Sequence, residues 1–145
     1  PEGHIEAPSM EADMIHLKEK VDAGADFIIT QMFFQNRFLY DFMERARREG
    51  IHIPIIPGIM PVTDIGKIKR FSQVCGATLP VALLEKMEKV ADSPEDARRT
   101  GIEFTIKQCD DLLKSGIRYF HFFTLNQADV VMQILNNFDL KTFQQ

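Results

Sequence analysis

The stretch that decides the fold is Ala23-Gly24-Ala25-Asp26-Phe27-Ile28-Ile29-Thr30-Gln31-Met32-Phe33-Phe34. Its apolar run, entered through small and turn-forming residues, is typical of a short buried strand in a parallel sheet. Gln31 closes this run, and a primary amide is costly to bury without hydrogen-bond partners. In parallel α/β folds, ligands bind at the carboxyl ends of the strands. Gln31 is therefore the first candidate for a side chain that contacts a substrate.

The composition is that of one modest globular domain. The chain has 145 residues, of which 45% are hydrophobic and 26% charged, with a net charge of -4 and a pI near 5.5. This acidic balance argues against a nucleic-acid partner, which requires a basic footprint. No apolar stretch approaches the roughly 20 residues of a membrane span, and no signal peptide is recognisable. The two cysteines, Cys75 and Cys109, form no close-spaced motif, which favours a reduced cytoplasmic protein.

Strand-like and helical segments alternate along the chain, which predicts an α/β fold. Strands are expected over 27–31, 53–61 and 119–124; helices are expected to end at Gly24 and Gly50, to span about 64–74, 80–90 and 94–115, and to begin again at Asn126 or Asp129. Ser9 and Ser93 are the expected caps, and Pro94 with Asp96 adds a capping box to the longest helix. Pro57 cannot donate to a ladder, so it predicts a bulge or the end of its strand.

This order of elements predicts parallel strands joined by helical crossovers, in a single domain over residues 1–145. Three strands are few for a doubly wound sheet, and a closed barrel needs eight strand–helix units. The chain is therefore expected to be part of an α/β barrel or a small open sheet.

Polar residues near the start of the chain suggest two hypotheses about ligand binding. His4, Glu6 and His16 do not have the spacing of a strong metal motif, so no metal is predicted, and contact of His4 with an organic ligand is the better hypothesis. Asp13, His16 and Lys20 lie at i, i+3 and i+7, on one helix face. That face is either solvated or a polar strip that contacts a ribose or phosphate. Glycine-rich dinucleotide and Walker motifs are missing from the sequence.

The later segments offer fewer polar candidates. Phe71, within a helix, and Phe123, in the third strand, are expected to be buried. His121 faces opposite to its aromatic neighbours in that strand, because side chains alternate across a sheet. Gln127 follows the same strand, and it shares a layer with Gln31 if the two strands are parallel neighbours.

Four blocks, in the same order as in the family, resemble methylenetetrahydrofolate reductases. They are Pro1-Glu2-Gly3-His4-x-Glu6-Ala7, Leu17-Lys18-x-Lys20-Val21-Asp22-Ala23-Gly24-Ala25-Asp26-Phe27-x-Ile29-Thr30-Gln31-x-Phe33-Phe34, Pro57-Gly58-Ile59-Met60-Pro61 and His121-Phe122-Phe123-Thr124-Leu125-Asn126. The resemblance covers nearly the whole chain, to residue 138.

The resemblance implies an eight-stranded α/β (TIM) barrel that carries FAD. Members pass a hydride from NADH or NADPH to the flavin, and then from the reduced flavin to methylenetetrahydrofolate, in a ping-pong reaction that yields methyltetrahydrofolate. The chain resembles the second half of the barrel, roughly its last three strands, so we expect it to be the C-terminal portion of a longer cytoplasmic reductase. The general acid near the folate and an Arg-Gly-Asp segment beside the flavin belong to the first half, so no catalytic residue is expected here.

The resemblance also assigns roles to individual positions. Flavin-contacting positions correspond to His4, Ala7, Asp13, His16, Lys20 and Phe123, and substrate-contacting positions to Gln31, Lys67, Phe71 and Gln127. Gln31 matches the amide that contacts the folate pterin, and Phe71 an aromatic residue that stacks on folate or nicotinamide in turn. His16 stands where bacterial members often have Asn, and Phe123 replaces a frequent Tyr. Gln127 replaces an Arg, which predicts that Lys67 anchors the glutamate tail of the folate.

Two alternatives to a folate reductase stay open. One is a non-catalytic or regulatory half-barrel, and the other is a different barrel enzyme that acts on a phosphorylated small molecule. The resemblance implies a folate substrate and does not choose between NADH and NADPH. It leaves open a homo-oligomer and, as in some anaerobic members, an electron-transfer partner. No nucleic-acid or membrane partner is expected.

Overall fold

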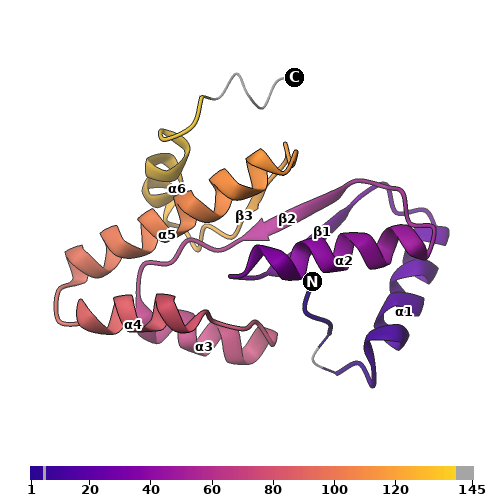
Figure 1. The fold of residues 1–145 in the computed structure, drawn as a ribbon, viewed down its shortest axis with the longest axis horizontal. Helices are drawn as coiled ribbons and strands as arrows, with labels where there is room; N and C mark the ends of the chain where they lie inside the picture. Colours follow the sequence, from indigo (N-terminus) through magenta and orange to yellow (C-terminus); the bar gives the residue numbers. More distant parts are fainter. Residues whose placement is uncertain (5, 140–145) are drawn as a thin grey trace.

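The computed structural model describes residues 1–4 and 6–139, and these form three strands and six helices (Figure 1). In chain order the elements are α1 (Met10–Asp22), β1 (Ile28–Met32), α2 (Asn36–Arg48), β2 (Ile55–Ile59), α3 (Ile65–Cys75), α4 (Val81–Lys89), α5 (Pro94–Lys114), β3 (His121–Phe122) and α6 (Ala128–Leu135). Residue 5 and residues 140–145 of the predicted domain lie outside the described residues. The predicted α/β class and order of elements are confirmed.

The helix ends follow local capping chemistry. The Ser9 side chain accepts a hydrogen bond from the Ala12 backbone at 3.1 Å, which satisfies one of the free N–H groups at the start of α1. Ser93 caps α5 in the same way, and Pro94 occupies the first helical position. The reciprocal half of the predicted capping box is wrong, because the Asp96 carboxylate pairs with Arg99 at 2.6 Å and does not return to the Ser93 backbone.

The three strands are parallel and lie in the order β1-β2-β3. The register pairs Ile29 with Ile56 and then Met32 with Gly58, so β1 has one extra residue opposite Pro57. This irregularity confirms the bulge predicted at Pro57, which has no N–H to donate. The Gly58 backbone N–H donates to the Thr30 hydroxyl at 2.9 Å, so a side chain supplies the acceptor across the bulge.

The third strand is much shorter than the predicted 119–124. β3 contains two residues, His121 and Phe122, although the Phe123 backbone still donates to the Ile59 carbonyl at 2.9 Å. Leu125 and Asn126 have φ angles of 47° and 62°, in the left-handed region, so the chain turns away from the sheet at this point. The predicted caps of the last helix, Asn126 and Asp129, are also wrong: Gln127 is the N-cap residue of α6.

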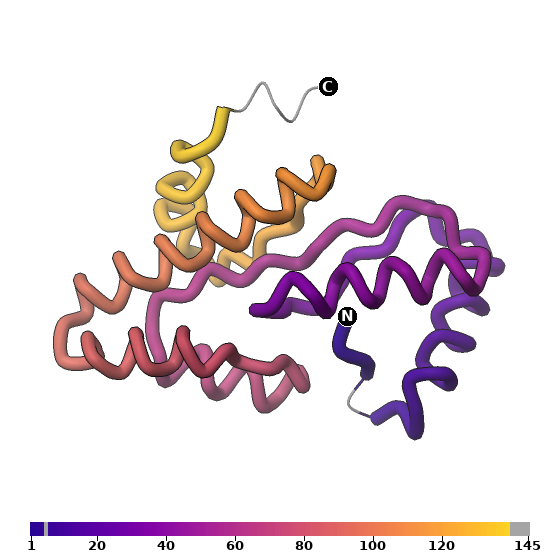
Figure 2. The backbone as a smooth tube through the Cα atoms, in the orientation of Figure 1, coloured from indigo at the N-terminus to yellow at the C-terminus, as the bar shows by residue number. Residues whose placement is uncertain are grey.

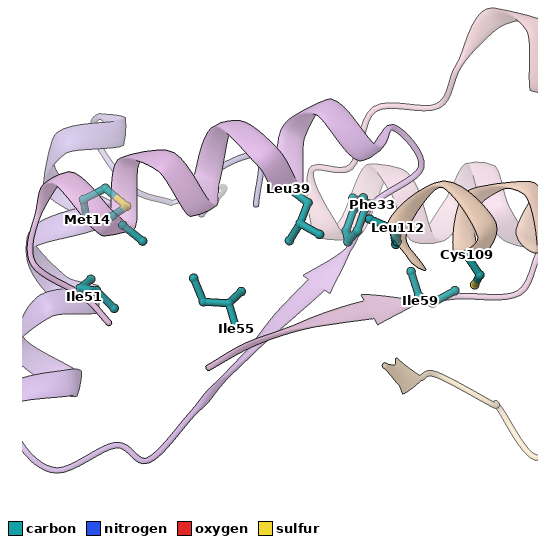
Figure 3. Packing of buried hydrophobic residues seen from close by; sticks show 9 residues of the cluster. Met14, Phe33, Leu39, Ile51, Ile55, Ile59, Cys109 and Leu112 are labelled. Carbon is teal, nitrogen blue, oxygen red and sulfur yellow. The ribbon is translucent and has the colours of Figure 1, made fainter. Parts of the chain in front are cut away.

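One hydrophobic cluster joins α1, α2, β2 and α5 (Figure 3). Figure 3 shows Leu39 pointing from α2 toward the sheet, with Phe33 and Leu112 beside it. Cys109 lies in the same cluster, and burial raises the pKa of its thiol to about 12, which makes it an inert core residue. A second cluster gathers Met32, Phe34, Met60, Val62, Ile68, Leu83, Met87 and Ala97 beyond the carboxyl ends of β1 and β2.

The sheet leaves part of β1 uncovered. Ile29 is 44% exposed and shares a face with the exposed Gln31, because side chains alternate along a strand, and Phe27, directly before β1, is 52% exposed. β1 is also an edge strand in the described sheet, paired with β2 alone. The exposed apolar residues at this strand are thus next to Gln31, the candidate ligand contact.

None of the helices in the described part of the chain is both long and apolar enough to cross a membrane.

We predict that Gly58→Ala destabilises the fold by about 1–3 kcal/mol, the usual range for overpacking. A Cβ atom at Gly58 would lie 2.3 Å from the Thr30 carbonyl oxygen and 2.7 Å from a Phe123 ring carbon. Urea unfolding followed by circular dichroism measures the loss. Gly66→Ala in α3 is the matched control, because its Cβ would meet the Asp64 carboxylate at 3.3 Å, and it is expected to change stability by less than about 1 kcal/mol. Equal unfolding curves for both variants would contradict the close packing of β1 on β2.

Candidate functional site

A cavity of about 380 Å³ opens between α1 and β1, and we call it the α1–β1 cavity. Its lining comes from the N-terminal segment, α1, β1, the middle of α2 and the end of α3: Pro1, Gly3, His4, Met10, Asp13, Met14, Leu17, Lys20, Ile28, Ile29, Thr30, Gln31, Phe42, Val74 and Cys75. The N-terminal segment runs between α1 and the end of α3 (Figure 2). The Thr78 backbone N–H donates to the Glu2 carboxylate at 3.0 Å, which ties this segment to the loop after α3. The cavity is therefore built from segments far apart in sequence.

A second, more open cavity of about 450 Å³ lies along the outer side of α1, and we call it the α1 surface cavity. It is lined by His4, Glu6, Ala7, Pro8, Asp13, His16, Glu19, Lys20 and Ala23. The two cavities share His4, Asp13 and Lys20. Five of the six positions expected to contact a cofactor thus lie along α1 and the loop that precedes it.

Hydrogen bonds fix the N-terminal loop of this site onto α1. The His4 backbone N–H donates to Asp13 Oδ2 at 3.0 Å, and the Glu6 backbone N–H donates to His4 Nδ1 at 3.2 Å. Because Nδ1 accepts, the neutral His4 ring carries its proton on Nε2. His16 Nδ1 lies 3.3 Å from the Glu19 carboxylate.

The two lysines near this site differ in their partners. Lys18 pairs with Asp22 on the same helix, whereas Lys20 has no ion pair within residues 1–4 and 6–139. The Lys20 ammonium, on the lining of both cavities, is therefore available to an anionic ligand.

The Gln31 carboxamide is exposed on the α1–β1 cavity. Its Oε1 accepts a hydrogen bond from the Met32 backbone N–H at 2.9 Å. Its Nε2 has no partner among the described residues, so two N–H donors remain for a ligand. The sequence placed Gln31 at the last position of the strand, and the structure places it one residue before the end.

The other predicted substrate positions lie in a narrow crevice of about 20 Å³ next to α3, which we call the Phe71 crevice. The crevice brings together Lys67, Phe71, Phe123 and Gln127. Phe123 was expected to be buried with the flavin-contacting group; the structure shows it partly buried and beside the substrate group, because β3 ends one residue before it. Its ring meets His121 edge-on, with the ring centres 4.8 Å apart.

Gln31 and Gln127 line different cavities, and the condition for their predicted shared layer is not met. The condition for that prediction was that their strands are neighbours, and β2 lies between β1 and β3. Gln31 therefore lines the α1–β1 cavity, whereas Gln127 lines the Phe71 crevice.

Sequence reasoning missed two residues of the site. Thr30 lines the α1–β1 cavity and bridges β1 to β2, but within an apolar run it resembled an ordinary β-branched strand residue. Asp64 lines the Phe71 crevice and accepts from the Lys67 backbone N–H at 2.7 Å as the N-cap residue of α3. An Asp directly before an apolar helical pattern is a capping signal that could have revealed it.

A fourth cavity, of about 430 Å³, lies between α4 and α5, and none of the predicted site residues lines it. Asn36 Nδ2 and Tyr40 Oη each donate to the Asp111 carboxylate at 2.7 Å, which links α2 to α5 beside this cavity. These hydrogen bonds, of which that from Asn36 has the larger effect, hold the pKa of Asp111 below its ordinary value.

Among the described residues, no group of three or more His, Cys, Asp or Glu side chains could hold a metal ion.

The fold and the cavities define an α/β protein whose polar cavity-lining side chains lie along α1 and past the carboxyl ends of parallel strands. The family model described as methylenetetrahydrofolate reductase matches residues 1–139. The chain belongs to this enzyme family.

Individual relatives agree with the family match. The chain is 37% identical over 141 residues to a probable methylenetetrahydrofolate reductase (NADPH) of Caenorhabditis elegans, and 34% identical to the 5,10-methylenetetrahydrofolate reductase of Escherichia coli; both matches cover 97% of the chain. It is 36% identical to methylenetetrahydrofolate reductase (NADH) 1 of Arabidopsis thaliana, over 91% of the chain. The chain spans 21%, 48% and 22% of the lengths of these three relatives, respectively.

Proposed function

We propose that the protein carrying this chain reduces methylenetetrahydrofolate to methyltetrahydrofolate, with FAD as its prosthetic group and NADH or NADPH as electron donor. Family membership over residues 1–139 is the observation that carries this proposal. It is supported by the cavity that His4, Ala7, Asp13, His16 and Lys20 line along α1 and its preceding loop. The relatives' names include both NADH and NADPH, so the choice of donor stays open.

The residues around α1 fit a flavin cofactor. Lys20 offers a cation to a phosphate, Asp13 and His4 offer polar atoms to ribityl or ribose hydroxyls, and Met14 and Leu17 supply an apolar floor. FAD, when bound, supplies the hydride chemistry, while the protein binds and orients the reacting partners. The hydrogen bond between His4 and Asp13 holds the loop and the helix in one geometry before any ligand arrives.

We assign the folate to residues of both the α1–β1 cavity and the Phe71 crevice. In this proposal Gln31 donates from the α1–β1 cavity to the pterin, and Phe71 stacks on a planar ligand. Lys67 and Gln127, in the same crevice as Phe71, take the glutamate tail. Phe123 also lines this crevice, and we assign it to the flavin, at the boundary between the flavin-contacting and the folate-contacting residues. The general acid lies outside this chain.

The sheet is, in this proposal, part of an eight-stranded barrel. Its support is the uncovered apolar surface of Phe27 and Ile29 on an edge strand, a combination that stable proteins normally cover. A further strand paired with β1 would cover it and place Gln31 inside the barrel mouth. Free thiols at Cys75 and Cys109 support a reducing, cytoplasmic location.

We expect the purified protein carrying residues 1–145 to be yellow, with an oxidised flavin spectrum. NADH or NADPH under anaerobic conditions should bleach this spectrum, and methylenetetrahydrofolate should restore it, because the two half-reactions share the flavin. Stopped-flow absorbance records both steps. A colourless protein that does not take up FAD would contradict the proposal and favour the non-catalytic half-barrel.

We predict that Gln31→Leu slows flavin reoxidation by methylenetetrahydrofolate about tenfold or more, because losing a hydrogen bond to the ligand costs on the order of 1.5 kcal/mol. Flavin reduction by the nicotinamide donor should change by less than about twofold. Gln133→Leu on the exposed side of α6 is the matched control and should affect neither step. Equal losses in both half-reactions would remove Gln31 from the folate site.

We predict that Lys20→Ala weakens FAD affinity about three- to tenfold, because a cation that contacts a phosphate near solvent contributes on the order of 1 kcal/mol. FAD titration of the apoprotein, followed by fluorescence, measures the change, and added salt should reduce the difference. Lys18→Ala is the control, because Lys18 lies on the same helix and pairs with Asp22. If both variants bind FAD like the wild type, the Lys20 side of α1 is a solvated face.

A further inference from the structure

The Thr30 side chain makes two hydrogen bonds at the bulge in β1. Its hydroxyl accepts from the Gly58 backbone N–H at 2.9 Å and donates to the Gln31 carbonyl at 3.0 Å. Thr30 is 5% exposed, so these bonds form away from bulk water, where an unmade hydrogen bond is costly. One hydroxyl therefore joins β2 to the backbone of Gln31.

The next hydrogen bond in the chain fixes the Gln31 side chain. The Met32 backbone N–H donates to Gln31 Oε1 at 2.9 Å. The register irregularity spans these residues, since the pairing jumps from Ile29 to Met32. The Met32 N–H thus holds the acceptor end of the carboxamide next to the bulge, and the donor end is left for the cavity.

We propose that Thr30 is a positioning residue, whose hydroxyl holds the bulge in the geometry that makes Gln31 a hydrogen-bond donor in the α1–β1 cavity. The ligand atom that Gln31 contacts is then an acceptor, such as a carbonyl oxygen or an unprotonated ring nitrogen. The effect of Thr30 on the reaction rate rests on the proposed function, the reduction of methylenetetrahydrofolate.

The test compares Thr30→Val, which keeps the shape of the side chain and removes the hydroxyl, with Thr30→Ser, which keeps the hydroxyl. Thr30→Val should slow flavin reoxidation by methylenetetrahydrofolate about tenfold and leave flavin reduction by the nicotinamide donor within about twofold. Thr30→Ser should retain at least about half of the wild-type reoxidation rate. In a Gln31→Leu background, Thr30→Val should add no further loss, because both changes act through the same carboxamide.

Thr105→Val is the matched control for stability. The Thr105 hydroxyl is buried, donates to the Gly101 carbonyl at 2.9 Å and accepts from the Val62 backbone N–H at 3.4 Å, so its removal also costs a buried pair of hydrogen bonds. If Thr105→Val slows flavin reoxidation as much as Thr30→Val does, or if the Thr30 and Gln31 effects multiply, the positioning role is overturned.

Hydrogen exchange of the Met32 amide provides a readout that needs no substrate. Thr30→Val and Gln31→Leu should each accelerate this exchange about tenfold or more, and Thr105→Val should not. Unchanged Met32 protection in Thr30→Val would overturn the inference even if the folate half-reaction is slow. A wild-type flavoprotein that methylenetetrahydrofolate does not reoxidise would instead overturn the proposed function, and the exchange measurement would still decide whether Thr30 positions Gln31.

Discussion

The hydrogen bond from the Gly58 backbone to the Thr30 hydroxyl fixes the way in which the central strand meets its neighbour. Pro57 interrupts the backbone ladder between β1 and β2, and this side-chain bond bridges the interruption at 2.9 Å. Gly58 also pairs with His121 on the other side, so one residue sets the register of all three strands. Because there is no room for a Cβ at this position, a change here displaces either β1 or Phe123, and with them both ligand-facing groups.

Features governed by local chemistry could be predicted from the sequence, and features governed by long-range pairing could not. The caps at Ser9 and Ser93 depend on neighbouring residues, and the bulge opposite Pro57 follows from the N–H that proline itself lacks, so these features were predicted. The length of the third strand depends on how far β2 accompanies it and on the left-handed turn at Leu125 and Asn126, which sequence patterns did not indicate.

In the candidate site too, the features that depend on local spacing could be predicted, and those that depend on long-range strand pairing could not. Asp13, His16 and Lys20 were predicted to share a face because helical spacing alone puts them together, and they line one cavity. The separation of Gln31 from Gln127 follows from the sheet order, which residue spacing does not encode. Thr30 was missed because its function depends on a backbone N–H from another strand.

Lysines that line the α1–β1 cavity and the Phe71 crevice differ in their ion pairs from lysines on the solvent-facing parts of the helices. On solvent-facing parts of the helices, Lys18 and Lys114 each pair with a carboxylate one turn away. Lys20 and Lys67 line the cavities and have no ion pair within the described part of the chain. In a chain with a net charge of -4, a lysine without a carboxylate partner leaves a local positive potential that favours anionic groups of a ligand. In the proposed function, a flavin phosphate pairs with Lys20 and a glutamate carboxylate of the folate pairs with Lys67.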